Sequence, residues 1–194
     1  MNETARVPDD AAPAPSWGVP RHRTVSWYDP ALVAAAAPTR SGLDFLRAIQ
    51  GGELPPPPIA SLFAFEMRTV EHGRVVFACR PDESAYNPIG VVHGGLVCTL
   101  LDTVAACAVH STLEAGVGYT SVDLAVQYLR PVTSDSGTLL ATGTVTKPGR
   151  RVAFSRAEAV DARGRLVATA TSSCLVMAPS PEPAAAALRR PPDG

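Results

Sequence analysis

The sequence predicts an α+β fold in which one antiparallel sheet wraps round a single long central helix. Three observations predict it. Residues 94–113 are apolar on nearly every face of a helix, which is typical of a helix that is buried on all sides. Six strand-like segments accompany this helix, two before it and four after it. The connections between the last strands contain turn residues at hairpin length, which favours antiparallel neighbours.

The composition limits the classes of partner. The chain has 194 residues, of which 17 are Lys or Arg and 18 are Asp or Glu, so its formal net charge is -1. This balance gives no electrostatic reason to expect nucleic acid or an anionic membrane as a partner. The first residues lack the pattern of a secretory signal, and no apolar run approaches the about 20 residues that span a bilayer. We therefore expect a cytoplasmic protein with no membrane partner.

The prolines divide the chain into three parts. Of the 19 prolines, ten lie in the first 58 residues and five in the last 16. We expect a Pro/Ala-rich N-terminal arm over 1–40, one domain over 41–177 and a flexible C-terminal tail over 178–194. The arm has three large apolar side chains that could dock it on the core, namely Trp17, Trp27 and Tyr28.

The first element of the domain is a short helix. Ser41 is a suitable N-cap, apolar residues recur every three positions over 42–50, and Gly51 and Gly52 follow. The four prolines at 55–58 exclude a helix at that point. The sequence therefore predicts one extra helix before the sheet.

The strands complete the fold. Residues 64–70 and 74–78 flank a turn-like triplet at 71–73, which predicts a β-hairpin. The four later strands are expected over 120–130, 137–146, 152–160 and 166–177. Small residues that we expect to face inward are Ala153, Ser155, Ala157 and Ala159 on one strand, and Thr169, Thr171 and Ser173 on the last. Six antiparallel strands curled round one helix form the hotdog architecture.

Chemistry is concentrated where the long helix begins. Residues 87–95 have the pattern N-x-x-G-x-x-H-G-G. Gly94 and Gly95 open the helix, where the first backbone N–H groups are unpaired and the helix dipole places partial positive charge. A carbonyl oxygen that gains negative charge fits this place, and glycines let a ligand approach the backbone closely.

Asp102 is the second chemical signal. A carboxylate in an apolar helix is costly unless it is paired, and its pKa would tend upward. A structural reading is also open, in which Asp102 faces solvent or bonds to a neighbouring strand. Gly94 and Asp102 are eight residues apart, about 12 Å along a helix, so they can meet at one reacting atom only if a second helix runs antiparallel beside the first. A twofold dimer would supply that helix.

Residues 87–95, with Asp102 nine residues after His93, closely resemble the PaaI-like branch of the hotdog-fold acyl-CoA thioesterases. The resemblance covers about residues 41–177 and implies an enzyme that hydrolyses an acyl-CoA or carrier-bound acyl thioester to a free acid and a thiol. It also implies a homodimer or homotetramer with shared sites, and no metal or other cofactor. The further matching segments are the proline run at 52–58, Thr120–Leu124, Tyr128–Val132 and Gly149–Arg151.

The resemblance assigns roles to individual residues. It implies that Asp102 acts as general base or nucleophile, while the Gly94 N–H and Asn87 polarise the thioester carbonyl. His93 would position the loop, and Ser121 would orient the attacking water. The candidates for substrate binding are Gly95 at the helix start and three arginines suited to coenzyme A phosphates, Arg130, Arg150 and Arg151.

Two alternatives stay open. A non-catalytic hotdog protein that binds acyl-CoA as a sensor would keep the pocket, although it would lack the acid that Asp102 supplies. A hotdog hydratase resembles a different motif, in which the aspartate precedes the histidine by about five residues. The sequence has no P-loop, no G-x-S-x-G elbow and no cysteine and histidine spacing typical of a metal site.

Overall fold

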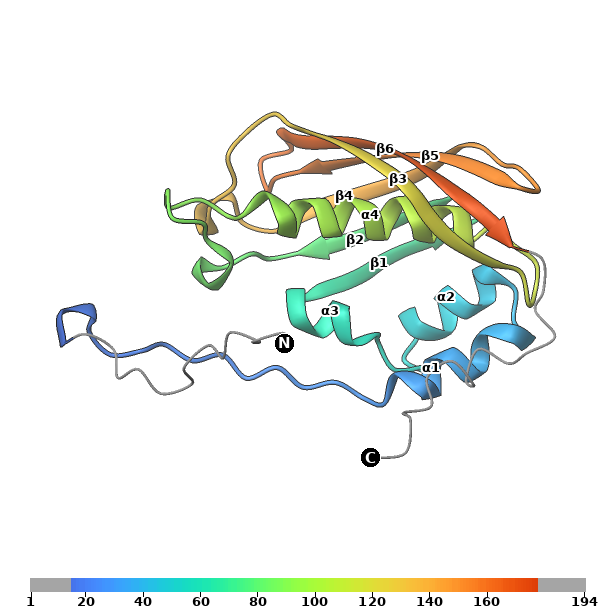
Figure 1. Cartoon of the computed structure of the whole chain (residues 1–194), viewed down its shortest axis with the longest axis horizontal. Coiled ribbons are helices and arrows are strands. Elements are labelled where there is room, and N and C mark those ends of the chain that lie inside the picture. The colour runs from blue at the N-terminus through green and yellow to red at the C-terminus, as the bar shows by residue number, and fades with distance from the viewer. Residues whose placement is uncertain (1–14, 178–194) are drawn as a thin grey trace, which may run out of the picture.

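The computed structural model describes residues 15–177 and confirms the hotdog architecture. The long helix α4 (Gly94–His110) lies against a six-stranded sheet in the order β1-β2-β4-β5-β6-β3, in which all neighbouring strands are antiparallel (Figure 1). The strands are β1 (Phe65–Glu71), β2 (Arg74–Cys79), β3 (Gly118–Tyr128), β4 (Leu139–Lys147), β5 (Val152–Val160) and β6 (Leu166–Met177). None of the helices within 15–177 has the length and apolarity needed to cross a membrane.

The predicted hairpin and extra helix are both present. β1 and β2 are joined through His72 and Gly73, and the φ of Gly73 is +76°, which favours glycine. Helix α2 (Gly42–Gln50) begins after Ser41, whose Oγ accepts a hydrogen bond from the Asp44 N–H. The start of α2 lies tightly against the end of α4, since a Cβ at Gly42 would lie 1.8 Å from the carbonyl oxygen of His110. Only glycine fits this contact.

The expectation that prolines 55–58 exclude a helix was wrong at its last residue. Helix α3 (Pro58–Phe63) begins at Pro58. Proline is tolerated at the first helical position because the N–H there has no partner within the helix. Two short helices therefore lie beside β1 instead of one.

The N-terminal arm also differs from expectation within the described residues. It contains helix α1 (Pro30–Ala36), which begins after the N-cap Asp29. Trp17 and Trp27 do not dock on the core, because they are 77% and 62% exposed, and Tyr28 is exposed as well. Residues 1–14 of the arm and the expected tail at 178–194 lie outside the described residues.

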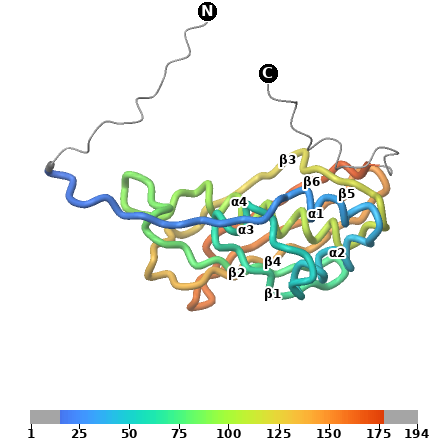
Figure 2. The backbone as a smooth tube through the Cα atoms, turned by 90° about the horizontal axis from the view of Figure 1, so that it is seen from below, coloured from blue at the N-terminus to red at the C-terminus, as the bar shows by residue number. Residues whose placement is uncertain are grey.

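Arginine side chains, and not the aromatic ones, attach the arm to the core. Arg21 pairs with Glu83, the first residue of the 3-10 helix η3 (Glu83–Ala85), and Arg23 donates to the carbonyl oxygen of Leu62 in α3. Figure 2 shows this segment as an extended blue tube that runs across the molecule before α1. The remaining 3-10 helices are η1 (Pro15–Trp17), η2 (Ala37–Thr39) and η4 (Ser134–Ser136).

The sequence predicts that helix α4 is buried on all sides, and this prediction was wrong. One face packs into the sheet and includes Leu100, Leu101 and Val104, which are fully buried. The opposite face is only half-covered and has the i, i+3, i+4 spacing of one side of a helix. We call this face the open stripe; its residues are Gly95, Cys98, Thr99, Asp102, Thr103, Ala106, Cys107 and His110. The enclosing sheet therefore covers about half of the helix.

The small residues of β5 face inward as predicted, whereas those named on β6 do not. Ala153, Ser155, Ala157 and Ala159 are buried on one face of β5. On β6 the buried series is Ala168, Ala170, Ser172 and Cys174, so Thr169 and Thr171 lie on the other face. The alternation along a strand groups residues correctly but does not tell which group meets the helix.

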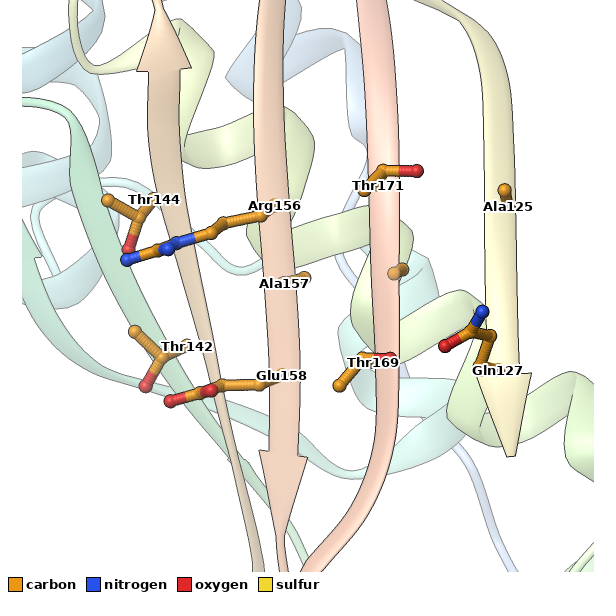
Figure 3. Close-up of a pocket in the computed structure, with 10 residues that line it drawn as sticks. Ala125, Gln127, Thr142, Thr144, Arg156, Ala157, Glu158, Thr169 and Thr171 are labelled. Atoms are coloured by element: carbon orange, nitrogen blue, oxygen red, sulfur yellow. The ribbon is translucent and has the colours of Figure 1, made fainter. Parts of the chain in front are cut away.

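The outer face of the sheet is polar. Figure 3 shows Arg156 and Glu158 of β5 among threonines of β4 and β6, where they line a shallow depression of about 380 Å³. This depression contains none of the predicted site residues. The candidate chemistry lies on the opposite, helix side of the sheet.

Candidate active site

The loop before α4 is organised by its own backbone. His93 is the N-cap of α4, where its Nδ1 accepts a hydrogen bond from the Gly95 N–H at 2.9 Å. Its own N–H donates to the carbonyl oxygen of Ala85 at 2.7 Å. These bonds fix the residue at which α4 begins, so His93 positions the loop relative to the helix.

Asn87 opens the same loop. Its N–H donates to the carbonyl oxygen of Val91 at 2.8 Å, and its side-chain Oδ1 accepts from the Ile89 N–H at 3.1 Å. The Asn87 side chain thus holds a local turn, which includes Gly90 at a φ of +80°. Among residues 15–177 no acceptor binds its Nδ2, which leaves the amide group free to donate to a ligand.

The first amide of α4 is also free. The Gly95 N–H is bound to His93 Nδ1 and the Leu96 N–H to the His93 carbonyl oxygen, whereas the Gly94 N–H has no acceptor among the described residues. An unpaired N–H at a helix start is a suitable donor for a developing oxyanion.

Tyr128 is a site neighbour that the sequence analysis did not single out. Its hydroxyl donates to the Gly94 carbonyl oxygen at 3.0 Å, and a Cβ at Gly94 would lie 3.1 Å from its ring. Burial raises the pKa of Tyr128, which keeps the hydroxyl a donor at neutral pH. Its position opposite Ala168, on the helix face of β3, is the signal that would have identified it.

Asp102 and Ser121 form the second cluster. The Ser121 hydroxyl donates to Asp102 Oδ1 at 2.9 Å. Asp102 is half-buried on the open stripe, and it matches both forms of the structural reading, since it bonds to a neighbouring strand and remains accessible. The two side chains line an open pocket of about 310 Å³ with Cys98, Thr99 and residues 122–124.

A β-bulge directs Ser121 toward the helix. Ser121 pairs with Cys174 and Asp123 pairs with Ser173, so that Val122 between them has no partner of its own. Cys174 is fully buried on the inner face of β6, and the residue opposite it shares that face. If Val122 were paired regularly instead of bulged, strand alternation would place Ser121 on the same outer face as Asp123. Asp123 holds the bulge in place, since its carboxylate accepts a hydrogen bond from Ser173.

Within one chain the predicted site residues form two separate clusters. Asn87, His93 and Gly94 lie at the start of α4, and Asp102 lies eight residues further, about 12 Å along the axis. The predicted arginines are divided in the same way. Arg130 follows β3 and donates to the carbonyl oxygen of Leu166 at 2.6 Å, whereas Arg150 lies in the β4–β5 turn beside residues 112–114 after α4. Arg151 is exposed in the same turn.

Known proteins resemble this chain over the region that contains α4 and β3. A family model described as Thioesterase superfamily matches residues 89–168. Acyl-coenzyme A thioesterase 13 of Homo sapiens is 33% identical over 97 residues, which cover 50% of this chain and 68% of that protein.

Two solved structures have the same fold. A structure from Ralstonia eutropha JMP134, described as a phenylacetic acid degradation-related protein, is 31% identical with a TM-score of 0.62, and the match covers 66% of this chain and 97% of that chain. The E. coli PaaI protein is 22% identical with a TM-score of 0.62 over 73% of this chain and 99% of that chain, which supports the fold alone. With its hotdog fold, its matching motif region and these relatives, the chain belongs to the thioesterase superfamily.

Proposed function

We propose that this protein is an acyl-CoA thioesterase that hydrolyses an acyl-CoA, or a carrier-bound acyl thioester, to the free acid and the thiol. The observation that carries the proposal is the Ser121–Asp102 hydrogen bond at 2.9 Å on the accessible face of α4, inside the region that matches the thioesterase family. The similarity to acyl-coenzyme A thioesterase 13 supports coenzyme A as the thiol.

The two clusters have complementary chemistry for this reaction. The Gly94 N–H and the Asn87 side-chain amide would donate to the thioester oxygen and polarise the carbonyl, as an oxyanion hole does. Asp102 would accept the proton of an attacking water or attack the carbonyl carbon itself, while Ser121 fixes the orientation of its carboxylate. His93 and Tyr128 would hold the helix start in position from opposite sides.

A twofold dimer would bring the clusters together. The N-terminal part of the open stripe offers the small residues Gly95, Cys98 and Thr99 to a second helix. The strand β3 is an edge strand, and Val122 on it is 64% exposed. An antiparallel second copy of α4 on this stripe would place its Asp102 near Gly94 of the first chain. Arg150 of the second copy would then approach the same end as Arg130 of the first, which suits a phosphate-bearing substrate. A homotetramer would be formed by two such dimers.

The test measures thiol release from a panel of acyl-CoA thioesters by the purified full-length protein. We expect turnover with at least one thioester, and we expect Asp102→Asn to lower kcat between about a hundredfold and ten-thousandfold because it removes an acid–base group from a similar shape. Asp135→Asn, at an exposed carboxylate in η4, is the matched control and should keep wild-type turnover.

The non-catalytic sensor is the outcome that would overturn the proposal. It would bind acyl-CoA in a calorimetric titration and release no thiol from any thioester of the panel. Wild-type turnover by Asp102→Asn would overturn the role of Asp102 instead.

A further inference from the structure

A second, larger cavity lies over the C-terminal part of the open stripe. It has a volume of about 640 Å³ and is bordered by α1, α2, α3 and β1, with the C-terminal half of α4 as its floor. Its lining is mainly apolar and includes Val33 of α1, Ile49 of α2 and Met67 of β1. A cavity of this size and character is typical of a small-molecule site.

The cavity begins next to the Asp102 cluster in the sequence of α4 and β3. Thr103, the residue after Asp102, lines it, as do Cys107 and His110 further along α4. Tyr119, two residues before Ser121 on β3, lines it as well, and its ring lies 4.9 Å from the ring of His110. From Asp102 to His110 the helix rises by about 12 Å. Asp102 therefore adjoins Thr103 at one end of the cavity floor, and His110 lies toward the other end.

The lining carries no charge along this path at neutral pH. Burial lowers the pKa of His110 to about 4 and raises the pKa of Cys107 to about 12. Burial also raises the pKa of Tyr119 well above its ordinary value. The one carboxylate in the lining, Glu66, forms an exposed ion pair with Arg68 at 2.7 Å. An apolar guest is therefore favoured over a charged one.

We propose that this cavity holds the acyl chain of the substrate and that the preferred acyl group is an extended aliphatic chain of about eight carbons or more. This inference rests on the proposed thioesterase function. With C–C bonds of about 1.5 Å, a zigzag chain of about ten carbons spans the distance from Asp102 to His110. A single aromatic ring on a short linker would fill only part of that length. Helices α1, α2 and α3 all precede residue 89, where the family match begins, so this chain's own N-terminal segment builds much of the cavity wall.

The first experiment compares saturated acyl-CoA thioesters of two to sixteen carbons, together with phenylacetyl-CoA, by thiol release. We expect kcat/KM to rise with chain length up to about ten carbons, by up to about fourfold for each methylene that is buried. A flat profile, or a maximum at acetyl-CoA, butanoyl-CoA or phenylacetyl-CoA, would overturn the inference. Failure to hydrolyse any thioester would instead contradict the proposed function.

The second experiment narrows and widens the cavity. Val33→Trp places a large ring in the cavity wall, and we expect the ratio of kcat/KM for decanoyl-CoA over butanoyl-CoA to fall at least tenfold. Leu32→Trp, its neighbour on α1 with 57% exposure, should keep the wild-type ratio. If the new ring at position 33 merely displaces α1, Ile49→Ala on α2 still tests the cavity wall. This change removes a contact between Ile49 and the acyl chain, so the ratio of kcat/KM for decanoyl-CoA over butanoyl-CoA should fall. An unchanged ratio in both Val33→Trp and Ile49→Ala would contradict the assignment of this cavity.

Discussion

The Ser121 hydroxyl on the edge strand β3 donates to Asp102 Oδ1 on α4 at 2.9 Å, and this bond exists because Val122 is an unpaired bulge residue. Bulges often lie next to active sites, where they redirect one side chain. Here the bulge joins two residues that are 19 positions apart in the sequence. The bond leaves the other carboxylate oxygen of Asp102 available for water or substrate.

Removal of the Ser121 hydroxyl should lower kcat. Because Ser121 orients the Asp102 carboxylate, Ser121→Ala should reduce kcat by about tenfold or more. The lost hydrogen bond to a charged group should also lower the melting temperature. Steady-state kinetics with the best acyl-CoA substrate measures this effect. Thr120→Ala, at an exposed neighbour on β3, is the control. If Ser121→Ala turns over at the wild-type rate, Ser121 does not orient Asp102.

The Asp123–Ser173 contact should matter although neither side chain contacts Asp102. Ser173→Ala removes the hydrogen bond that holds the bulge, and regular pairing would then turn Val122 inward and Ser121 outward. We expect kcat to fall severalfold with KM nearly unchanged.

Deletion of Val122 in the Ser173→Ala background should restore the rate. Without Val122, regular pairing places Ser121 opposite Cys174 again, on the helix face. Measured kcat values for the single and double variants decide the question, and a double variant as slow as Ser173→Ala would exclude a positioning role for the bulge.

Two inactive variants should complement each other if the site is shared between chains. In a dimer of Asp102→Asn with Asn87→Ala, one site carries both lesions and the other carries neither. Random exchange makes half of the dimers mixed, so the mixture should regain about a quarter of the wild-type activity if the sites are independent. Native mass spectrometry confirms the exchange. No recovery after confirmed exchange would mean that the site is built within one chain or that Asn87 has no part in it.

His110 should make stability depend on pH. Its side chain lies between the rings of Phe45 and Tyr119, and burial lowers its pKa from 6.5 to about 4 in the folded state. Between these values the unfolded chain binds more protons than the folded chain, so the free energy of unfolding falls as the pH decreases through this window. At pH 5 the loss from this group is about 2 kcal/mol.

Urea denaturation of the wild type and His110→Gln at pH 7.5 and pH 5 isolates this contribution. We expect the difference in unfolding free energy between the two proteins to change by about 2 kcal/mol between the two pH values. His72→Gln, in the exposed hairpin turn, should follow the wild type. If the unfolding free energies of the wild type and His110→Gln change equally between the two pH values, His110 is not held in its neutral form.

Local signals made most of the fold predictable from the sequence. Ser41 and Gly51 bracket α2 as expected, since caps act within one turn of the chain. The last two strands have the predicted bounds, at 152–160 and 166–177, because hairpin turns separate them clearly. Pro58 begins α3 against expectation because proline carries no penalty in the first turn of a helix.

The candidate site was predictable in its residues but not in its geometry. The motif at 87–95 and Asp102 were recognisable, whereas the orientation of Ser121 depends on strand register, which is a tertiary property. The sequence did not predict the open stripe. Its cysteine, alanine and threonine residues are found both in the buried core of a single chain and at a contact with a second helix. Composition does not distinguish these two environments.

The open stripe on α4 also has a kinetic consequence. If the two clusters meet only across two chains, an isolated chain has no complete site. The hydrolysis rate is then proportional to the concentration of dimers. Well below the dissociation constant of the pair, doubling the protein concentration would quadruple the rate; well above it, doubling would only double the rate. The rate would change from a second-power to a first-power dependence on protein concentration near the dissociation constant of the dimer. A kinetic measurement alone would therefore give the strength of the contact between the two helices.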